Sequence, residues 1–115
     1  MVIGGYTPPR GSRVEFGALL LGYYADGGLR YAGKVGTGFD QATLHELGRR
    51  LRELRQPEPP FVAADLIRDR ALTWVEPQLV AQVGFTEWTR DGRLRHPRFL
   101  GLRDDKSPLE VIREA

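Results

Sequence analysis

The sequence predicts a mainly β domain of the OB type, which is a five- or six-stranded antiparallel Greek-key barrel with one main helix and a short C-terminal helix. Strand-like runs separated by glycine and proline occupy most of the chain, and one strongly helical stretch follows the third run. An OB barrel carries a helix at that position, where it covers one end of the barrel. With 115 residues, of which 41% are hydrophobic, the chain is long enough for one core and too short for two. Another small β-barrel, or a half-sandwich with one helix, is the alternative fold.

The first three strands are predicted near the N-terminus. Residues 2–6 form a short apolar run, and the prolines and glycine of residues 7–12 predict a loop after it. A longer apolar run over residues 15–24 predicts the second strand. The Asp-Gly-Gly sequence at 26–28 favours a tight reversal, so we expect residues 29–35 to return antiparallel to the second strand.

The main helix is predicted over residues 40–55. Asp40 is placed to accept a hydrogen bond in the first turn, and several arginines lie toward the end, where the helix dipole favours cations. The prolines among residues 56–60 end the helix, because proline cannot continue it. Its apolar positions recur at steps of three and four residues: Leu44, Leu47, Leu51 and Leu54.

The second half of the chain predicts two or three further strands. Residues 61–71 are expected to form a long connection with a helical turn, and residues 108–114 a short terminal helix. The barrel is therefore expected over residues 1–106, with a helical tail over residues 107–115. The expected strands are 73–77, 79–89, which alternates in the manner of a half-buried strand, and 94–102.

Charge is unevenly distributed along the chain, although its formal net charge is only +2. Residues 57–89 carry two cations and five acidic side chains, whereas residues 90–106 carry six cations and three acidic side chains. Of the 17 cations 15 are arginine, whose planar fork binds phosphate oxygens in pairs. A GC-rich genome would produce the same bias, so the basic segment at 90–106 is the stronger indication of an anionic partner.

Composition excludes several classes of protein. The chain has no cysteine, which rules out disulfides and zinc fingers. Its two histidines, His45 and His96, lie far apart without an acidic partner at metal-ligand spacing, so we expect no metal site. No apolar run approaches the roughly 20 residues needed to cross a bilayer, and we expect a soluble, monomeric, cytoplasmic protein. No Ser-His-acid arrangement or catalytic pair of carboxylates is readable.

Two segments have the composition of phosphate-contacting surfaces. Residues 33–39 combine three glycines with Lys34 just before the N-terminus of the main helix. The alternative is a barrel corner that needs glycine for its bend. The second segment is 94–106, where Pro97 predicts an edge position or a bulge. Its apolar side chains are expected to pack and its arginines to point outward: Leu94, Phe99, Leu100 and Leu102 against Arg95, Arg98 and Arg103.

Each of these features also has an ordinary structural explanation. The cluster Arg103-Asp104-Asp105-Lys106 is typical of a self-neutralising surface patch as well as of a site. Trp74 and Trp88 are of a type that stacks on bases in single-strand binders, but we expect both to belong to the core.

These segments together resemble the C-terminal OB-fold domain of ATP-dependent DNA ligases, and most closely the ligase module of bacterial DNA ligase D, a protein of non-homologous end joining. The resemblance covers the whole chain. Its most specific part is Arg-His-Pro-Arg-Phe at 95–99 followed by Arg-Asp-Asp-Lys at 103–106, which is similar to the last nucleotidyltransferase motif of the family. The other matching stretches are 2–6, 16–22, 33–39 and 74–77.

The resemblance implies two successive tasks in DNA repair. The domain first closes over an adenylation domain, where the last motif orients the β and γ phosphates of ATP while a lysine attacks the α phosphate. It then turns to grip nicked duplex DNA in the minor groove opposite the nick. By position, Arg103, Asp105 and Lys106 would carry the first task, assisted by Arg98. The candidates for contact with DNA are Lys34, Gly36, Thr37, Gly38 and Arg95.

The chain also departs from the family. The adenylated lysine stands in a Lys-x-Asp-Gly motif, and neither Lys34 nor Lys106, which are the only lysines, has that context. We therefore expect the adenylation domain, and with it the site for ATP and Mg²⁺, to lie outside this chain, which by itself should bind neither and be inactive. A stand-alone OB-fold nucleic-acid-binding module is the alternative, and a protein-interaction module has the least support.

Overall fold

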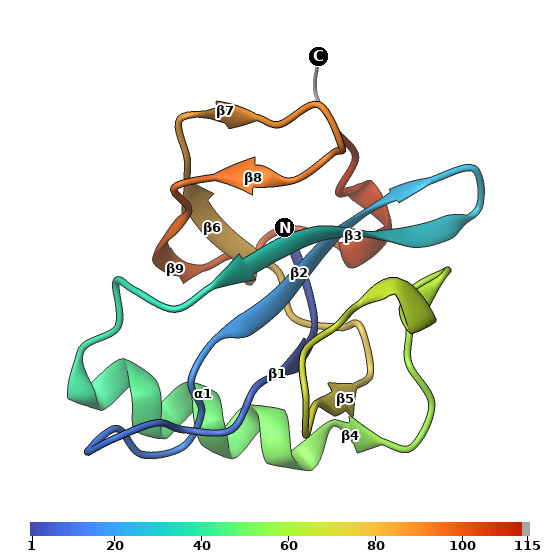
Figure 1. Cartoon of the computed structure of the whole chain (residues 1–115). Helices are drawn as coiled ribbons and strands as arrows, with labels where there is room; N and C mark the ends of the chain where they lie inside the picture. Colours follow the sequence, from blue (N-terminus) through green and yellow to red (C-terminus); the bar gives the residue numbers. More distant parts are fainter. Residues whose placement is uncertain (114–115) are drawn as a thin grey trace.

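The computed structural model describes residues 1–113 and shows one α-helix among short antiparallel strands (Figure 1). The predicted mainly β fold with one main helix is therefore confirmed. The elements are β1 (Val2–Tyr6), β2 (Leu19–Ala25), β3 (Gly28–Val35), α1 (Gln41–Glu53), β4 (Arg55–Gln56), the 3₁₀ turn η1 (Ala64–Leu66), β5 (Thr73–Val75), β6 (Ala81–Gly84), β7 (Glu87–Trp88), β8 (Leu94–Arg95), β9 (Arg98–Leu102) and the 3₁₀ turn η2 (Pro108–Glu110).

The predicted hairpin joins β2 and β3 in a five-stranded sheet of order β3-β2-β1-β5-β4. Asp26 and Gly27 have φ angles of 52° and 77°, the left-handed geometry that a tight two-residue reversal requires. β2 begins at Leu19, later than the predicted residue 15. Phe16 before it is fully buried, and the loop closes where Gly17 N donates to Thr7 O at 3.0 Å. The early part of the apolar run therefore packs in the core without pairing as a strand.

The two smaller sheets are β6-β9 and β7-β8, and backbone hydrogen bonds connect the five-stranded sheet to the first of them. At the start of β1, which β5 does not reach, Ile3 N donates to Leu79 O at 2.9 Å and Ala81 N donates to Met1 O at 2.7 Å. On the opposite side Phe99 N, in β9, donates to Thr37 O, just after β3, at 2.9 Å. The path β1-β2-β3-β9-β6-β1 follows the strand order of an OB barrel, but its β3-β9 seam is made by this bond and not by a continuous ladder.

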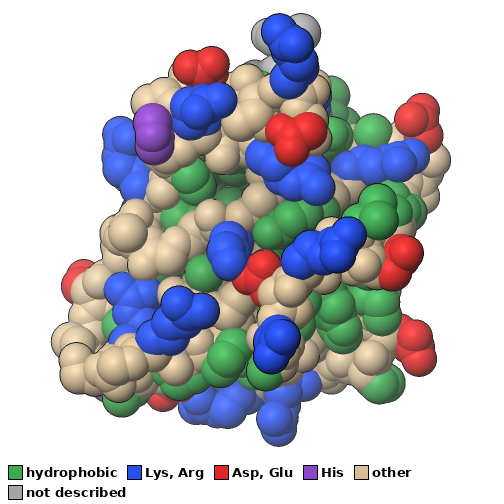
Figure 2. Space-filling view, viewed as in Figure 1, with side chains coloured by type: hydrophobic (Ala, Val, Ile, Leu, Met, Phe, Trp, Pro, Cys, Tyr) green, Lys and Arg blue, Asp and Glu red, His purple; other side chains and the backbone are tan. Residues whose placement is uncertain are grey.

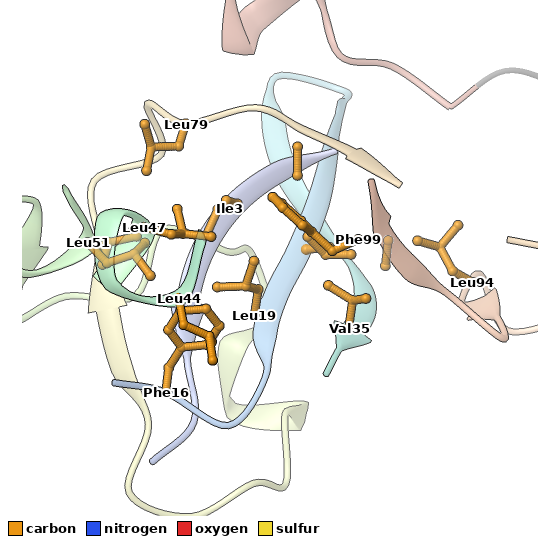
Figure 3. Packing of buried hydrophobic residues seen from close by; sticks show 14 residues of the cluster. Ile3, Phe16, Leu19, Val35, Leu44, Leu47, Leu51, Leu79, Leu94 and Phe99 are labelled. Carbon is orange, nitrogen blue, oxygen red and sulfur yellow. The ribbon is translucent and has the colours of Figure 1, made fainter. Parts of the chain in front are cut away.

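Helix α1 lies across one end of the strands, as an OB barrel requires (Figure 1). The helix begins after Asp40, whose side chain accepts a hydrogen bond from Thr43 N at 2.7 Å. Its buried face consists of Leu44, Leu47, Gly48 and Leu51. Figure 3 shows the three leucines facing the strand side chains, and all belong to one apolar cluster with Ile3, Phe16, Leu19, Leu79 and Phe99. The fourth predicted position, Leu54, is the C-cap and only half-buried.

The cap at Asp40 makes helix stability pH-dependent. Its hydrogen bonds with Thr43 hold the pKa of the Asp40 carboxyl below its ordinary value, so the cap stabilises the fold above that ordinary value and is lost as the pH falls through the lowered pKa. We expect Asp40→Ala to lower the thermal midpoint at pH 7, whereas Asp40→Asn should keep the cap and lose its acid dependence. Thermal unfolding from pH 7 to pH 2.5 checks this, and an equal midpoint for Asp40→Ala and the original chain would contradict it.

Two predicted strands are interrupted in the structure. The run 94–102 breaks into β8 and β9 because His96 adopts a φ of 53° next to Pro97, which agrees with the bulge that the proline predicts. The run 79–89 breaks into β6 and β7 around Phe85 and Thr86, and Phe85 lies at the surface. Leu100 was expected in the core, but its side chain is exposed.

The C-terminal helix expected over residues 108–114 is shorter than predicted. Within the described residues it is the 3₁₀ turn η2, and residues 114–115 lie outside the described part. The tail nevertheless docks, since Val111 is buried and its carbonyl accepts a hydrogen bond from Tyr24 N at 2.8 Å.

Candidate functional site

Arg103 is held in a fixed orientation at the end of β9. Its Nε and Nη2 donate to the two carboxylate oxygens of Asp105 at 3.0 and 3.1 Å, and its Nη1 donates to Gln82 Oε1 at 3.0 Å. The hydrogen bond from Arg103 lowers the pKa of the Asp105 carboxyl, and Asp105 in turn raises the pKa of Arg103. The fork–fork geometry makes Asp105 a positioning residue for Arg103 and leaves the guanidinium partly exposed.

Lys106 lies beside Arg103 on the wall of a small pocket of about 180 Å³. Among residues 1–113 Lys106 forms no ion pair with a carboxylate. Met1 lines the same pocket, and burial, followed by the charges of Lys106 and Arg103, lowers the pKa of its ammonium to about 6. The other lining residues include Val80, Val83, Phe85, Trp88, Val111 and Ile112. A pocket with two cations and an apolar wall is suited to an anion.

Arg98 and Arg95, also predicted as site residues, lie outside that pocket. Arg98 is at the other end of β9, paired with Gly84, and a Cβ built on Gly84 would lie 2.9 Å from the Arg98 Cζ. Arg95 lies in β8 with its Nε 3.9 Å from Glu87 Oε1. The structure thus brings Arg103, Asp105 and Lys106 together and leaves Arg98 apart from them.

The glycine-rich segment after β3 has a structural role at Gly38. Its φ of 96° is unfavourable for other residues, and a Cβ there would lie 2.3 Å from the carbonyl oxygen of Phe99. The barrel-corner explanation therefore accounts for Gly38. The carbonyl groups of Gly36 and Thr37 are engaged within the fold, by Arg13 and Phe99 respectively. The role of Gly36, Thr37 and Gly38 in DNA contact stays a prediction.

Lys34 belongs to a basic cleft that the sequence pattern did not reveal. The cleft, with a volume of about 770 Å³, is bordered by the loop between β1 and β2, by β3, and by residues 68–71. Figure 2 shows Lys and Arg side chains gathered over the viewed face of the molecule. The five cations that line the cleft are Arg10, Arg13, Lys34, Arg68 and Arg70, and the one carboxylate is Asp69.

Arg13 organises one wall of this basic cleft. Its Nη1 donates to the carbonyls of Gly17 and Gly36 at 2.9 and 2.8 Å, which ties the β1–β2 loop to the segment after β3. The guanidinium also stands 5.8 Å from the ring centroid of Phe39. No sequence signal marked the four arginines of the cleft, because they come from segments far apart in the chain and residues 57–89 are acidic overall.

Neither a metal cluster nor a membrane-spanning helix is found in the described part of the chain. Among residues 1–113 no group of three or more His, Asp or Glu side chains is arranged to hold a metal ion. No helix there is long and apolar enough to cross a membrane. Trp74 and Trp88 are half-buried and pack against the apolar clusters, in agreement with a core role.

Comparison with known proteins gives concordant matches. The sequence profile of the family described as ATP dependent DNA ligase C terminal region matches residues 12–106. The chain is 45% identical to the multifunctional non-homologous end joining DNA repair protein LigD of Mycobacterium tuberculosis over 99% of its own length, and 44% identical to LigD of Pseudomonas aeruginosa over 98%. It is 37% identical over 92% of its length to a DNA ligase of Halorubrum lacusprofundi.

Solved structures agree with the sequence matches. The ligase domain of M. tuberculosis LigD superimposes with a TM-score of 0.87 at 44% identity, covering 98% of this chain and 37% of that domain. Mycobacterial DNA ligase D complexed with ATP and MES gives a TM-score of 0.84 at 43% identity, covering 98% of this chain and 36% of the other. The chain spans only 15% of the length of M. tuberculosis LigD and 14% of that of P. aeruginosa LigD.

Proposed function

This chain belongs to the family formed by the C-terminal region of ATP-dependent DNA ligases, and from that membership we propose that it is the OB-fold module of such a ligase, acting in end-joining repair. It assists lysine adenylylation and then clamps nicked duplex DNA during nick sealing. The single observation that carries the proposal is the pair Arg103 and Lys106, an oriented guanidinium beside an ammonium that pairs with no carboxylate among residues 1–113, on one small pocket.

The cationic pocket fits the polyphosphate of ATP. In such a ligase, bound ATP would supply the adenylyl group and the pyrophosphate leaving group, and Mg²⁺ would neutralise charge on the phosphates. Arg103 would offer the N–H groups of Nη1 and Nη2 that Asp105 and Gln82 leave free, and Lys106 its point charge, to the β and γ phosphates. Oriented cations of this kind stabilise the negative charge of a departing polyphosphate. Asp105 holds Arg103 in place and touches no phosphate. Arg98 lies at the other end of β9, remote from this pocket, so any help that it gives in orienting the phosphates comes from there.

The module has two proposed partners, one for each of its two steps. The adenylation domain of the same ligase supplies the lysine, ATP and Mg²⁺, and nicked duplex DNA is the second partner. The residues that contact DNA are drawn from Lys34, Gly36, Thr37, Gly38 and Arg95. As a bacterial DNA repair module, the monomeric domain works in the cytoplasm at the nucleoid.

Reconstitution in trans tests the proposal. We expect the chain, added to a separately produced adenylation domain of a LigD ligase with ATP and Mg²⁺, to increase the rate of AMP transfer to the lysine. The matched variants are Lys106→Ala, which should abolish the increase, and Arg49→Ala, which removes one cation from the exposed face of α1 and should keep it. No increase with the original chain, or an increase that survives Lys106→Ala, contradicts the assignment and leaves the stand-alone nucleic-acid-binding module as the better explanation.

A further inference from the structure

The basic cleft is separate from the pocket of Arg103 and Lys106, because the two share no lining residue. Its cations come from three segments that meet only in the folded domain: the loop after β1, strand β3, and residues 68–70. Three of them, Arg10, Arg68 and Arg70, are exposed and form no ion pair among residues 1–113. A concave surface with this density of like charge attracts polyanions.

Asp69 is the only carboxylate among the described residues that line the cleft. It forms an ion pair with the Lys34 ammonium, and its side chain is only 23% exposed whereas that of Lys34 is 47% exposed. The flanking Arg68 and Arg70 are exposed, so the arginines face solvent while the carboxylate faces Lys34. An ion pair at a partly exposed site contributes little to stability, so an incoming anion can replace it.

The lining favours the backbone of a duplex over single-stranded bases. None of the described residues that line the cleft is aromatic, so they offer no platform for stacking, which single-strand binders use to hold bases. The guanidinium groups of the arginines and the ammonium of Lys34 can donate hydrogen bonds to phosphodiester oxygens. Such contacts fix the position of a protein on DNA without reading the base sequence. In a DNA ligase module the polyanion with this chemistry is duplex DNA.

We propose that the basic cleft binds the phosphodiester backbone of duplex DNA and that the Asp69 carboxylate pairs with the Lys34 ammonium when DNA is absent. A phosphate that binds Lys34 must then displace the Asp69 carboxylate. Arg10, Arg68 and Arg70 make the first contacts, and Lys34 is released to a phosphate as Asp69 moves away. The inference rests on the proposed function and adds to it a site and a built-in competitor.

Duplex affinity of the 115-residue chain tests the inference. With an unnicked DNA duplex, measured from about 50 to 300 mM salt, Asp69→Asn should tighten binding about five- to tenfold near 0.1 M salt and steepen the log–log salt dependence by about 0.9, the effect of one more phosphate contact. Arg68→Ala and Arg70→Ala should each weaken binding and reduce the slope by about the same amount.

Matched variants separate a local effect from net charge. Asp26→Asn makes the same charge change at an exposed ion pair on the β2–β3 turn, and Arg49→Ala removes a cation from α1, so both should leave the slope unchanged. Combining Lys34→Ala with Asp69→Asn should abolish most of the gain, because Asp69 acts through Lys34.

Two outcomes would overturn the inference: an Asp69→Asn effect no larger than that of Asp26→Asn, or equal losses for Arg68→Ala and Arg49→Ala. Tighter binding of single strands than of duplex would point to another ligand. None of these measurements involves adenylylation. They can therefore contradict the DNA-binding role of the cleft while the reconstitution in trans supports the proposed function, and the opposite result is equally possible.

Discussion

Lys106→Ala in the complete ligase is expected to slow lysine adenylylation by about 100-fold or more, while sealing of a nick that is already adenylylated stays nearly unchanged. The reason is that the negative charge on the β and γ phosphates must be neutralised only in the first step, where pyrophosphate leaves. Lys106 pairs with no carboxylate in the described residues, so its removal leaves no buried partner behind and the loss reports on the phosphates. Single-turnover rates of the two steps, measured separately, provide the test.

Arg103 gives a second, graded form of the same test. Arg103→Ala should reproduce the defect of Lys106→Ala. Arg103→Lys keeps the charge but cannot match both oxygens of Asp105 and also reach Gln82, so it should recover only part of the rate. Arg49→Ala is the control with the same loss of charge. Equal losses in adenylylation and in sealing, or no loss in adenylylation, would contradict the role of the cluster.

Gly38→Ala is expected to destabilise the domain by about 3 kcal/mol, the upper end of the range for strained backbone positions. Two penalties add, because the φ of 96° disfavours a side chain and the new Cβ would lie 2.3 Å from a backbone carbonyl that cannot move aside cheaply. That carbonyl belongs to Phe99 in β9, so the clash falls on the seam that joins β3 to β9. Urea unfolding followed by tryptophan fluorescence measures the change.

Gly27→Ala separates the two penalties. Gly27 has a φ of 77°, but a Cβ there meets no atom within 4 Å, so its replacement should cost only the conformational part, about 1–2 kcal/mol. If Gly38→Ala lowers the free energy of unfolding by no more than Gly27→Ala, the close approach of Gly38 to the Phe99 carbonyl has no energetic effect. The structural role assigned to Gly38 would then be wrong.

Local periodicity predicted the helix and the hairpin well, because their signals are contained in a few neighbouring residues. Leu44, Leu47 and Leu51 are buried as their spacing indicates, and Asp40 caps the helix. The charged cluster was also readable, since Arg103 and Asp105 are two residues apart and form their contact within one short segment. The function predicted for the cluster rests on the resemblance and not on the charges themselves.

Features that depend on distant segments or on single backbone angles were not predictable. Alternation over 94–102 cannot reveal that His96 turns to a positive φ. It also cannot reveal that the pairing of β6 with β9 shifts register at Leu100, whose side chain is exposed next to the buried Phe99. The basic cleft was missed for a different reason. Arg10 and Arg68 are 58 positions apart and become neighbours of one cleft only through the pairing of β1 with β5 and the course of the connection after α1.

Strand β9 connects the segment at Thr37 to the cluster of Arg103 and Lys106. Phe99 anchors the strand to Thr37 within the segment expected to meet DNA, and the strand ends at Leu102, immediately before Arg103. If DNA contact at Thr37 shifts β9, the affinity of Arg103 for polyphosphate changes by some factor. Because coupling free energies are reciprocal, bound polyphosphate must then change the affinity of the domain for DNA by the same factor. A strand of five residues would then set how strongly nucleotide and DNA exclude or favour each other.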